Sequence, residues 1–194
     1  MKRFVDLLFR GALNEDNANV LKELGYVALA SPYGGQEING IKVVKLTLLR
    51  HGKAVEAHDD VLKVFVISRG EEIKITSTLK AADVIEIRGK ALSHIGAKAL
   101  KKLASARKPV GIPMIEVIDS LMLGGSVDGL LKLLAEYMRG SIDVLIGSGA
   151  SKAVEAIHPY IYVAVLVDLG LSEAHASYAV FDSPMRILRG VVRV

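Results

Sequence analysis

Short runs rich in Val, Ile and Leu alternate along this chain with longer stretches of helical periodicity, and this alternation limits its fold most. The runs are nearly continuous in apolar residues, which is typical of strands buried on both faces. Repeated strand–helix units predict a parallel sheet. The expected strands are Arg3–Asp6, Tyr26–Leu29, Val43–Leu49, Val64–Ser68, Val84–Arg88, Val110–Met114 and Val144–Gly147.

The stretches between these strands carry the residues that begin and end helices. About seven strand–helix units without a nucleotide-binding glycine motif favour a small TIM-barrel-like (β/α) barrel over an open doubly wound sheet. We expect residues 1–194 to form one domain, with Ser31–Gly40 as a turn-rich loop inside it. The expected helices are Asp16–Leu24 closed by Gly25 as C-cap, Ala91–Ala106, Val127–Met138 with Ser126 as N-cap, and one that begins after His158-Pro159.

Composition removes several classes of function. The chain has no cysteine, so it has neither disulfides nor thiol chemistry. Tryptophan is absent and aromatic residues make up 5%, which argues against a platform that stacks single-stranded bases. The apolar run near Ile161–Val167 is far shorter than the roughly 18 residues of a membrane span. Asp6 and Arg10 interrupt any signal-like start, so we expect a cytoplasmic protein.

Positive charge is concentrated in one block. The net charge is +4, yet no acid occurs between Glu86 and Glu116. At 100° per residue, one side of the expected helix Ala91–Ala106 is basic and the other is apolar, so this helix would expose a basic face. The basic side carries His94, Lys98, Lys101 and Lys102, and the apolar side carries Leu92, Ile95, Ala99 and Leu103. Such a face is typical of a partner with a phosphate backbone, although an ordinary solvated helix face explains it equally well. The positive residues of the block are Arg88, Lys90, Lys98, Lys101, Lys102, Arg107 and Lys108.

A small-residue turn follows the last expected strand, in Gly147-Ser148-Gly149-Ala150-Ser151-Lys152. Backbone amides in such a turn can hold a phosphate, and Lys152 would add charge. The sequence is neither a Walker loop nor a nucleophile elbow, because glycine lies directly on both sides of Ser148. A simple tight turn between strand and helix remains the plainer interpretation.

Three acids, Asp6, Glu116 and Asp143, lie at or near expected strand ends, where barrel enzymes place their active sites. A catalytic metal centre also needs closely placed histidines. The first strand has no histidine, and the five histidines are scattered along the chain. We therefore expect no metal site, with Asp6 as a buried cap or the partner of a lysine. The histidines are His51, His58, His94, His158 and His175.

The C-terminal third resembles the archaeal ribonuclease P protein component 3 family, relatives of the thirty-kilodalton subunit of the eukaryotic enzyme. The shared features are a strand that enters Ser148-Gly149-Ala150, a Leu-Gly with a following Glu-Ala, and a closing Pro-x-x-Ile-Leu with arginine. They stand here as Asp143–Ala150, Leu169-Gly170-Leu171-Ser-Glu173-Ala174-His175-Ala176-Ser177 and Ser183-Pro184-Met-Arg186-Ile-Leu188-Arg189. Shorter matches at Phe4–Leu7, Leu21–Tyr26, His94–Lys98 and Val110–Glu116 extend the resemblance over most of the chain, except Ser31–Lys63.

The resemblance implies a barrel similar to polymerase and histidinol phosphatase domains, and a protein that is not catalytic alone. It would help a catalytic RNA remove the 5′ leader of precursor tRNA. The protein would bind no cofactor, since the RNA uses the Mg²⁺. Its partners would be this RNA, precursor tRNA and a small ferredoxin-like subunit in a heterotetramer. The expected RNA-binding residues are Arg88, Lys90, His94, Lys98, Lys101, Lys102, Lys152 and His175, and no membrane is involved.

Two departures from the family pattern limit what is carried over. Ser93 replaces an aspartate before His94, so an Asp–His pair is lost. Ile157 replaces an arginine before His158-Pro159. Two alternatives stay open: a metal-dependent barrel phosphohydrolase acting on a small phosphorylated substrate, and a non-catalytic barrel scaffold. The sequence leaves open which RNA elements are touched, which surface meets a protein partner and how many copies assemble.

Overall fold

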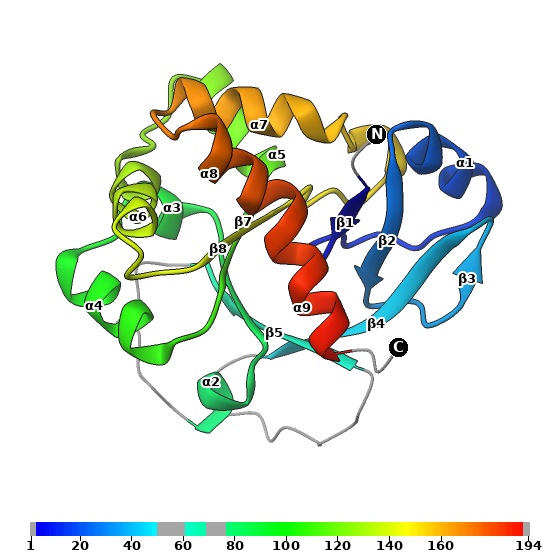
Figure 1. Ribbon diagram of the computed structural model, residues 1–194, viewed down its shortest axis with the longest axis horizontal. Helices are drawn as coiled ribbons and strands as arrows, with labels where there is room; N and C mark the ends of the chain where they lie inside the picture. The colour runs from blue at the N-terminus through cyan, green and yellow to red at the C-terminus, as the bar shows by residue number, and fades with distance from the viewer. Residues whose placement is uncertain (1–2, 50–60, 69–76, 192–194) are drawn as a thin grey trace.

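The computed structural model describes residues 3–49, 61–68 and 77–191, and its strands form one sheet in the order β1-β2-β4-β5-β6-β7-β8. Every neighbouring pair along this path is parallel, and helices follow most of the strands (Figure 1). This confirms the predicted barrel-like α/β fold. The strands are β1 Phe4–Asp6, β2 Tyr26–Ser31, β3 Glu37–Ile38, β4 Ile41–Leu49, β5 Val61–Ile67, β6 Val84–Ile87, β7 Val110–Pro113 and β8 Val144–Gly147.

One strand lies inside the segment expected to be only a loop. β3 pairs antiparallel with β4, with Glu37 opposite Lys42 and Ile38 opposite Ile41. Asn39 and Gly40 between them both have positive φ, 48° and 81°. An Asn-Gly pair with this geometry is the preferred two-residue hairpin turn. The Asn39-Gly40 pair therefore predicts this hairpin, which the expectation of a turn-rich loop over Ser31–Gly40 did not include.

Most helices lie on the outside of the sheet (Figure 1). No helix in the described part of the chain is long and apolar enough to cross a membrane. Gly25, with φ 88°, follows the true C-cap Leu24, and Val127 rather than Ser126 is the N-cap of α6. The helices are α1 Glu15–Glu23, α2 Ser77–Ala81, α3 Lys90–Ser93, α4 Ala97–Ala106, α5 Met114–Met122, α6 Asp128–Met138, α7 Pro159–Asp168, α8 Glu173–Ser177 and α9 Ser183–Val191, with a 3-10 turn at Ala153–Glu155 and a π turn at Tyr178–Asp182.

The helix expected over Ala91–Ala106 is wrong as a single element, because α3 ends at Ser93 and α4 begins at Ala97. Between them, Gly96 has an extended backbone and is the N-cap of α4. Ile95 in the same connection is buried. The apolar spacing continues across the break, so periodicity alone predicted one helix.

The barrel interior is filled, and Leu8 occupies much of one layer. A Cβ on Gly147 would lie 2.6 Å from the Leu8 Cβ, and a Cβ on Gly111 would lie 3.1 Å from the Leu8 Cδ2. Glycine is needed at both positions because this side chain takes the space. α9 lies against β1 and β8, and adds Ile187 and Leu188 to the same buried cluster (Figure 1).

Candidate functional site

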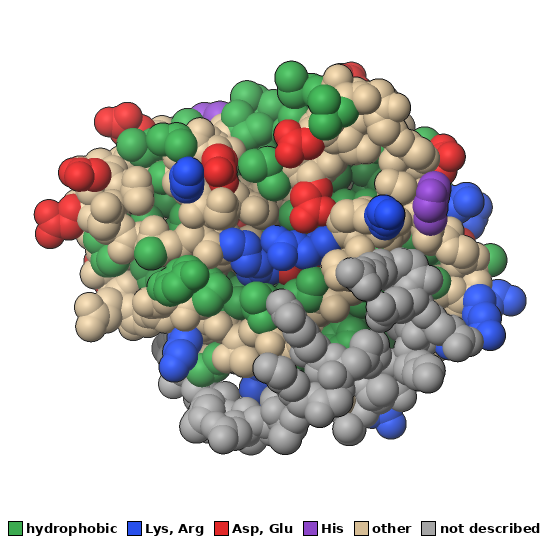
Figure 2. Space-filling view, turned by 180° about the vertical axis from the view of Figure 1, so that it is seen from behind, with side chains coloured by type: hydrophobic (Ala, Val, Ile, Leu, Met, Phe, Trp, Pro, Cys, Tyr) green, Lys and Arg blue, Asp and Glu red, His purple; other side chains and the backbone are tan. Residues whose placement is uncertain are grey.

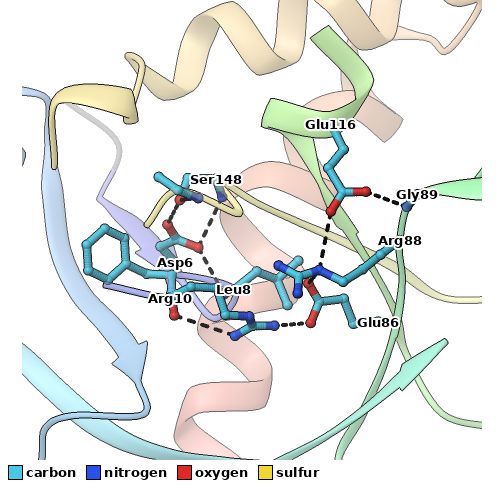
Figure 3. Close-up of polar contacts among 10 residues, drawn as sticks. Asp6, Leu8, Arg10, Glu86, Arg88, Gly89, Glu116 and Ser148 are labelled. Carbon is cyan, nitrogen blue, oxygen red and sulfur yellow. Dashed lines mark hydrogen bonds and ion pairs between the residues drawn. The ribbon is translucent and has the colours of Figure 1, made fainter. Parts of the chain in front are cut away.

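Charged side chains gather where the carboxyl ends of the parallel strands meet, an opening that we call the barrel mouth (Figure 3). Barrel enzymes place their binding groups at this end. Four residues form the mouth cluster. Arg10 follows β1, Glu86 lies in β6, Arg88 follows β6, and Glu116 lies in the first turn of α5. Figure 2, the view from behind Figure 1, shows Lys and Arg side chains across the middle of that face, with Asp and Glu side chains beside them.

Glu86 is the buried centre of the cluster. Its side chain is 0% exposed and pairs with both arginines: its Oε1 lies 3.0 Å from Arg88 Nε, and its Oε2 pairs with a terminal nitrogen of Arg10. Side chains two residues apart on a strand point to the same face. Val84, two residues before Glu86 on β6, is buried in the same cluster as Leu8 in the barrel interior, so Glu86 also faces the interior. A carboxylate in this position is retained as a charge only with such partners.

Arg10 is a nearly buried cation. Burial and the neighbouring charge of Arg88 lower the pKa of its guanidinium to about 10, so it stays protonated at neutral pH. One terminal nitrogen pairs with Glu86, and the other donates a long hydrogen bond, 3.5 Å, to the Phe9 carbonyl. Its Nε is buried and has no hydrogen-bond partner in the part of the chain that the structure describes.

Glu116 closes the cluster from the side of α5. Its Oε1 lies 3.3 Å from Arg88 Nε, and its Oε2 accepts the Gly89 N–H. The side chain is 28% exposed, so it reaches solvent while Glu86 does not. A guanidinium and a backbone amide therefore hold one accessible carboxylate at the mouth.

Asp6 and Ser148 join the two ends of the sheet. Asp6, at the end of β1, accepts the N–H groups of Leu8 at 2.9 Å and Ser148 at 3.1 Å, and also the Ser148 hydroxyl. Burial raises its pKa above the usual value, and the hydrogen bonds from Ser148 and Leu8 and the charge of Arg10 oppose this. The expected buried cap is found, and the charge that acts on it belongs to Arg10 rather than to a lysine.

Four amides of the small-residue turn after β8 donate to acceptors of the chain itself. The Ser148 N–H donates to Asp6, and the Ala150 N–H donates to the Ser148 hydroxyl at 3.0 Å. The N–H groups of Ser151 and Lys152 both donate to Glu155, at 2.8 and 3.1 Å. The protein's own acceptors thus occupy these four amides, as a tight turn would have it, and the binding of phosphate here with the help of Lys152 stays a prediction.

The basic face of α4 has the predicted geometry. Leu100 and Leu103 are buried, and Lys98 and Lys101 on the other side are exposed, with Lys102 half-buried. Lys98 and Lys102 each also interact with another residue of the chain. The structure thus brings three of the predicted RNA-binding lysines together on one helix face.

The other predicted RNA-binding residues are distributed over the molecule. Arg88 lies in the mouth, half-buried between two carboxylates, and Lys90 is exposed at the start of α3. His94 lies in the break between α3 and α4, not on the lysine face as expected. Lys152 is exposed after β8, and His175 on α8 packs edge-on against Tyr137, with ring centroids 5.6 Å apart.

The three acids expected at strand ends do not come together. Asp143 precedes β8 and therefore lies at the opening opposite Asp6, where it pairs with Arg186 of α9. Within residues 3–49, 61–68 and 77–191, no three His, Asp or Glu side chains are grouped as metal ligands. His158 is the N-cap of α7, and its ring accepts the Tyr160 N–H at 3.4 Å. His51 and His58 lie outside the described residues.

The mouth cluster was missed at the sequence level, although one signal was present. Glu86 and Arg88 lie two residues apart in the buried run that begins at Val84, so their side chains point to the same side of a strand. Charges in such a run need partners, which makes them candidates for a functional group. Nothing local identifies Arg10 or Glu116 as those partners.

No family model and no curated protein matches the chain in sequence. In structure it is similar to a chain of archaeal ribonuclease P solved by cryo-EM with mature tRNA, with TM-score 0.71, 14% identity, and coverage of 96% of this chain and 90% of that one. It is also similar to a prolidase complexed with N-methylphosphonate-L-proline, with TM-score 0.61, 10% identity and coverage of 100% and 77%. An uncharacterised protein gives TM-score 0.61, 10% identity and coverage of 97% and 75%. These similarities show the fold.

Proposed function

We propose that the chain is a protein subunit of ribonuclease P that assists the catalytic RNA in removing the 5′ leader of precursor tRNA. The observation that carries this proposal is the likeness to a chain of archaeal ribonuclease P over 96% of this chain and 90% of that one. The C-terminal patterns Asp143–Ala150 and Ser183–Arg189 resemble the same family. The polypeptide alone is proposed to be non-catalytic, as one subunit of an endoribonuclease holoenzyme.

The basic face of α4 is the proposed RNA contact. Lys98, Lys101 and Lys102 present three charges on one rigid helix, as a phosphate backbone requires. Such contacts position RNA without reading its sequence. The partner RNA would hold the Mg²⁺ and perform the hydrolysis, and the protein would stabilise its fold.

A protein partner is proposed as well, the small ferredoxin-like subunit, with pairs assembled into a heterotetramer in the cytoplasm. Exposed apolar side chains on α5 and α7 support a protein partner, because apolar groups that gather on a surface mark interaction sites. They include Met122, 80% exposed, and Tyr160 and Ile161, 46% and 45% exposed. Figure 2 shows hydrophobic side chains gathered at the top of the molecule, the end at which Figure 1 places α5 and α7.

The test is cleavage of precursor tRNA by the cognate RNA with its other protein subunits, with and without this chain. We expect the chain to lower the magnesium requirement or raise the rate. The variant Lys98→Ala/Lys101→Ala/Lys102→Ala should do less, and the slope of log affinity against log salt should fall by about 2–3. A matched control replaces three exposed lysines on other elements, Lys42, Lys80 and Lys132, and should behave like the unmodified chain.

A second candidate is a metal-dependent phosphohydrolase acting on a small phosphorylated substrate; the likeness to a prolidase supports only that a hydrolase can share this fold. Metal-dependent hydrolysis of a small phosphorylated compound without RNA would favour it. A chain that adds nothing to an otherwise active holoenzyme would exclude the ribonuclease P proposal. If the chain then binds neither RNA nor metal, the barrel is a scaffold.

A further inference from the structure

The outer edge of the Arg88 guanidinium is not used by the mouth cluster. Both its contacts pass through Nε, 3.0 Å from Glu86 and 3.3 Å from Glu116. Its two terminal nitrogens have no hydrogen-bond or ion-pair partner within the described residues. The side chain is 27% exposed, and Figure 3 shows the guanidinium reaching from the end of β6 between Glu86 and Glu116. A planar fork of N–H donors is suited to bind two phosphate oxygens.

A second cation lies behind the first. The Arg10 side chain is 9% exposed, and its buried Nε has no hydrogen-bond partner among residues 3–49, 61–68 and 77–191. Glu86 bridges the two guanidiniums from the inside. With Glu116 turned outward, Arg10, Arg88 and Glu86 carry a net charge of about +1, counting each as ionised. This charge matches a singly charged phosphate group.

Glu116 shows how an anion is held at this place. Its carboxylate accepts the Gly89 N–H and lies beside the Arg88 guanidinium, which is how proteins bind phosphate oxygens. A cavity of about 270 Å³ adjoins Gly89 and Glu116 on the side away from Arg88, and is lined by Ser93, Ser120, Ser126 and one further acid, Asp119. It gives the Glu116 side chain room to turn. An accessible carboxylate on the first turn of a helix can leave this position without disturbing the buried pair below it.

We propose that the barrel mouth binds a phosphate group, which Arg88 and the Gly89 amide hold in place of the Glu116 carboxylate. Glu116 is then a resident competitor that keeps the site occupied until phosphate arrives. The site stands independently of the ribonuclease P proposal, because the phosphate can belong to RNA or to a small molecule.

Titration of the purified chain with inorganic phosphate, against chloride at equal ionic strength, tests the site. The NMR signal of the Gly89 amide reports it, since that N–H would exchange a carboxylate for phosphate. Glu116→Gln removes the competing charge and should tighten phosphate binding about tenfold, whereas Arg88→Lys removes the fork and should weaken it about tenfold. Glu136→Gln is the matched control: this side chain is also 28% exposed and paired with an arginine, Arg139, and it should change nothing.

Two results would overturn the proposal: Glu116→Gln binds phosphate no more tightly than the unmodified chain, or Arg88→Lys binds it equally well. If circular dichroism shows that Arg88→Lys does not fold, the Glu116→Gln result decides alone. A short single-stranded RNA titrated in parallel identifies the source of the phosphate. RNA binding that tightens in Glu116→Gln indicates RNA, and an effect on inorganic phosphate alone indicates a small molecule.

Discussion

At the scale of single residues, Glu86 keeps two guanidiniums together in the barrel mouth. It is fully buried, and both arginines contact it. Glu86→Gln keeps the shape and removes the charge, so Arg10 and Arg88 would face each other without compensation. We expect the free energy of unfolding to fall by about 3 kcal/mol, as when one partner of a buried ion pair is removed. Urea unfolding followed by circular dichroism measures this change.

The control for that measurement is Glu136→Gln. Glu136 pairs with Arg139 three residues later on the surface, where solvent screens the interaction. Its urea midpoint should stay within experimental error of the unmodified chain. An equally small effect of Glu86→Gln would mean that the mouth cluster contributes no net stability.

Asp6 should make stability depend on pH. Its pKa in the folded protein is raised above the ordinary 3.8, so the folded state holds the proton more strongly than the unfolded chain. The favourable contribution is complete below the unfolded pKa and is lost as pH rises through the folded pKa. Asp6→Asn keeps acceptors for Leu8 and Ser148 but cannot ionise. The stability of this variant relative to the unmodified chain should therefore increase with pH, as measured by urea unfolding in steps upward from about pH 4.

Asp168→Asn, on the exposed surface at the end of α7, provides the baseline for this series. A relative stability of Asp6→Asn that falls with rising pH would show that the hydrogen bonds to Asp6 outweigh its burial.

The sequence predicted the role of Asp6 but did not predict the pairing of Arg10 with Glu86. Asp6 was singled out because it closes an apolar run, and it proved to be a buried cap. Arg10 and Glu86 were not paired, because 76 residues separate them and no local pattern joins them. Contacts of this kind depend on strand order, which one sequence does not specify by itself.

At the scale of elements, Gly129 determines how closely α6 approaches the break between α3 and α4. A Cβ there would lie 2.3 Å from the Leu92 carbonyl oxygen and 2.9 Å from the Ile95 nitrogen. Both are backbone atoms, so neither can turn away. Gly129→Ala should destabilise the protein by about 1–3 kcal/mol through overpacking, measured by thermal or urea unfolding.

Gly190→Ala is the matched substitution. Gly190 lies in α9 with open space around it, so alanine meets no neighbour. There the change should stabilise the protein by about 0.5–1 kcal/mol, because alanine favours helix. Stabilisation at both positions would contradict the close approach at Gly129.

Strands were predicted better than helices, and the difference follows from what each pattern encodes. A short Val, Ile and Leu run such as Val144–Gly147 reports burial on both faces, which decides the strand. The Ala91–Ala106 pattern reports only one apolar side, and Leu92 and Leu103 stay on that side whether or not the helix breaks between them. Gly96 was the only local hint of the break.

At the scale of the whole molecule, the barrel closes without a strand ladder. β1 and β8 are the two ends of the sheet order among the described strands, and hydrogen bonds from Ser148 to Asp6 join them. These two residues are 142 positions apart, so sequence periodicity could predict parallel strands but not this closure. The C-terminal Ile-Leu of the family resemblance has a physical role here, because Ile187 and Leu188 of α9 are buried in the interior cluster.

This arrangement makes α9 the part of the molecule on which the β1–β8 junction depends. Leu188→Ala should cost about 2–4 kcal/mol of stability, and the loss should be felt first where α9 lies. Hydrogen exchange measures this: amides of β1 and β8 should lose protection more than those of β4 and β5, which pair along a longer register away from the junction. Arg189→Ala, exposed on the same helix, should change neither set. Equal loss of protection across all strands in Leu188→Ala would show instead that the barrel opens only as a unit, with α9 as one more part of a single cooperative core.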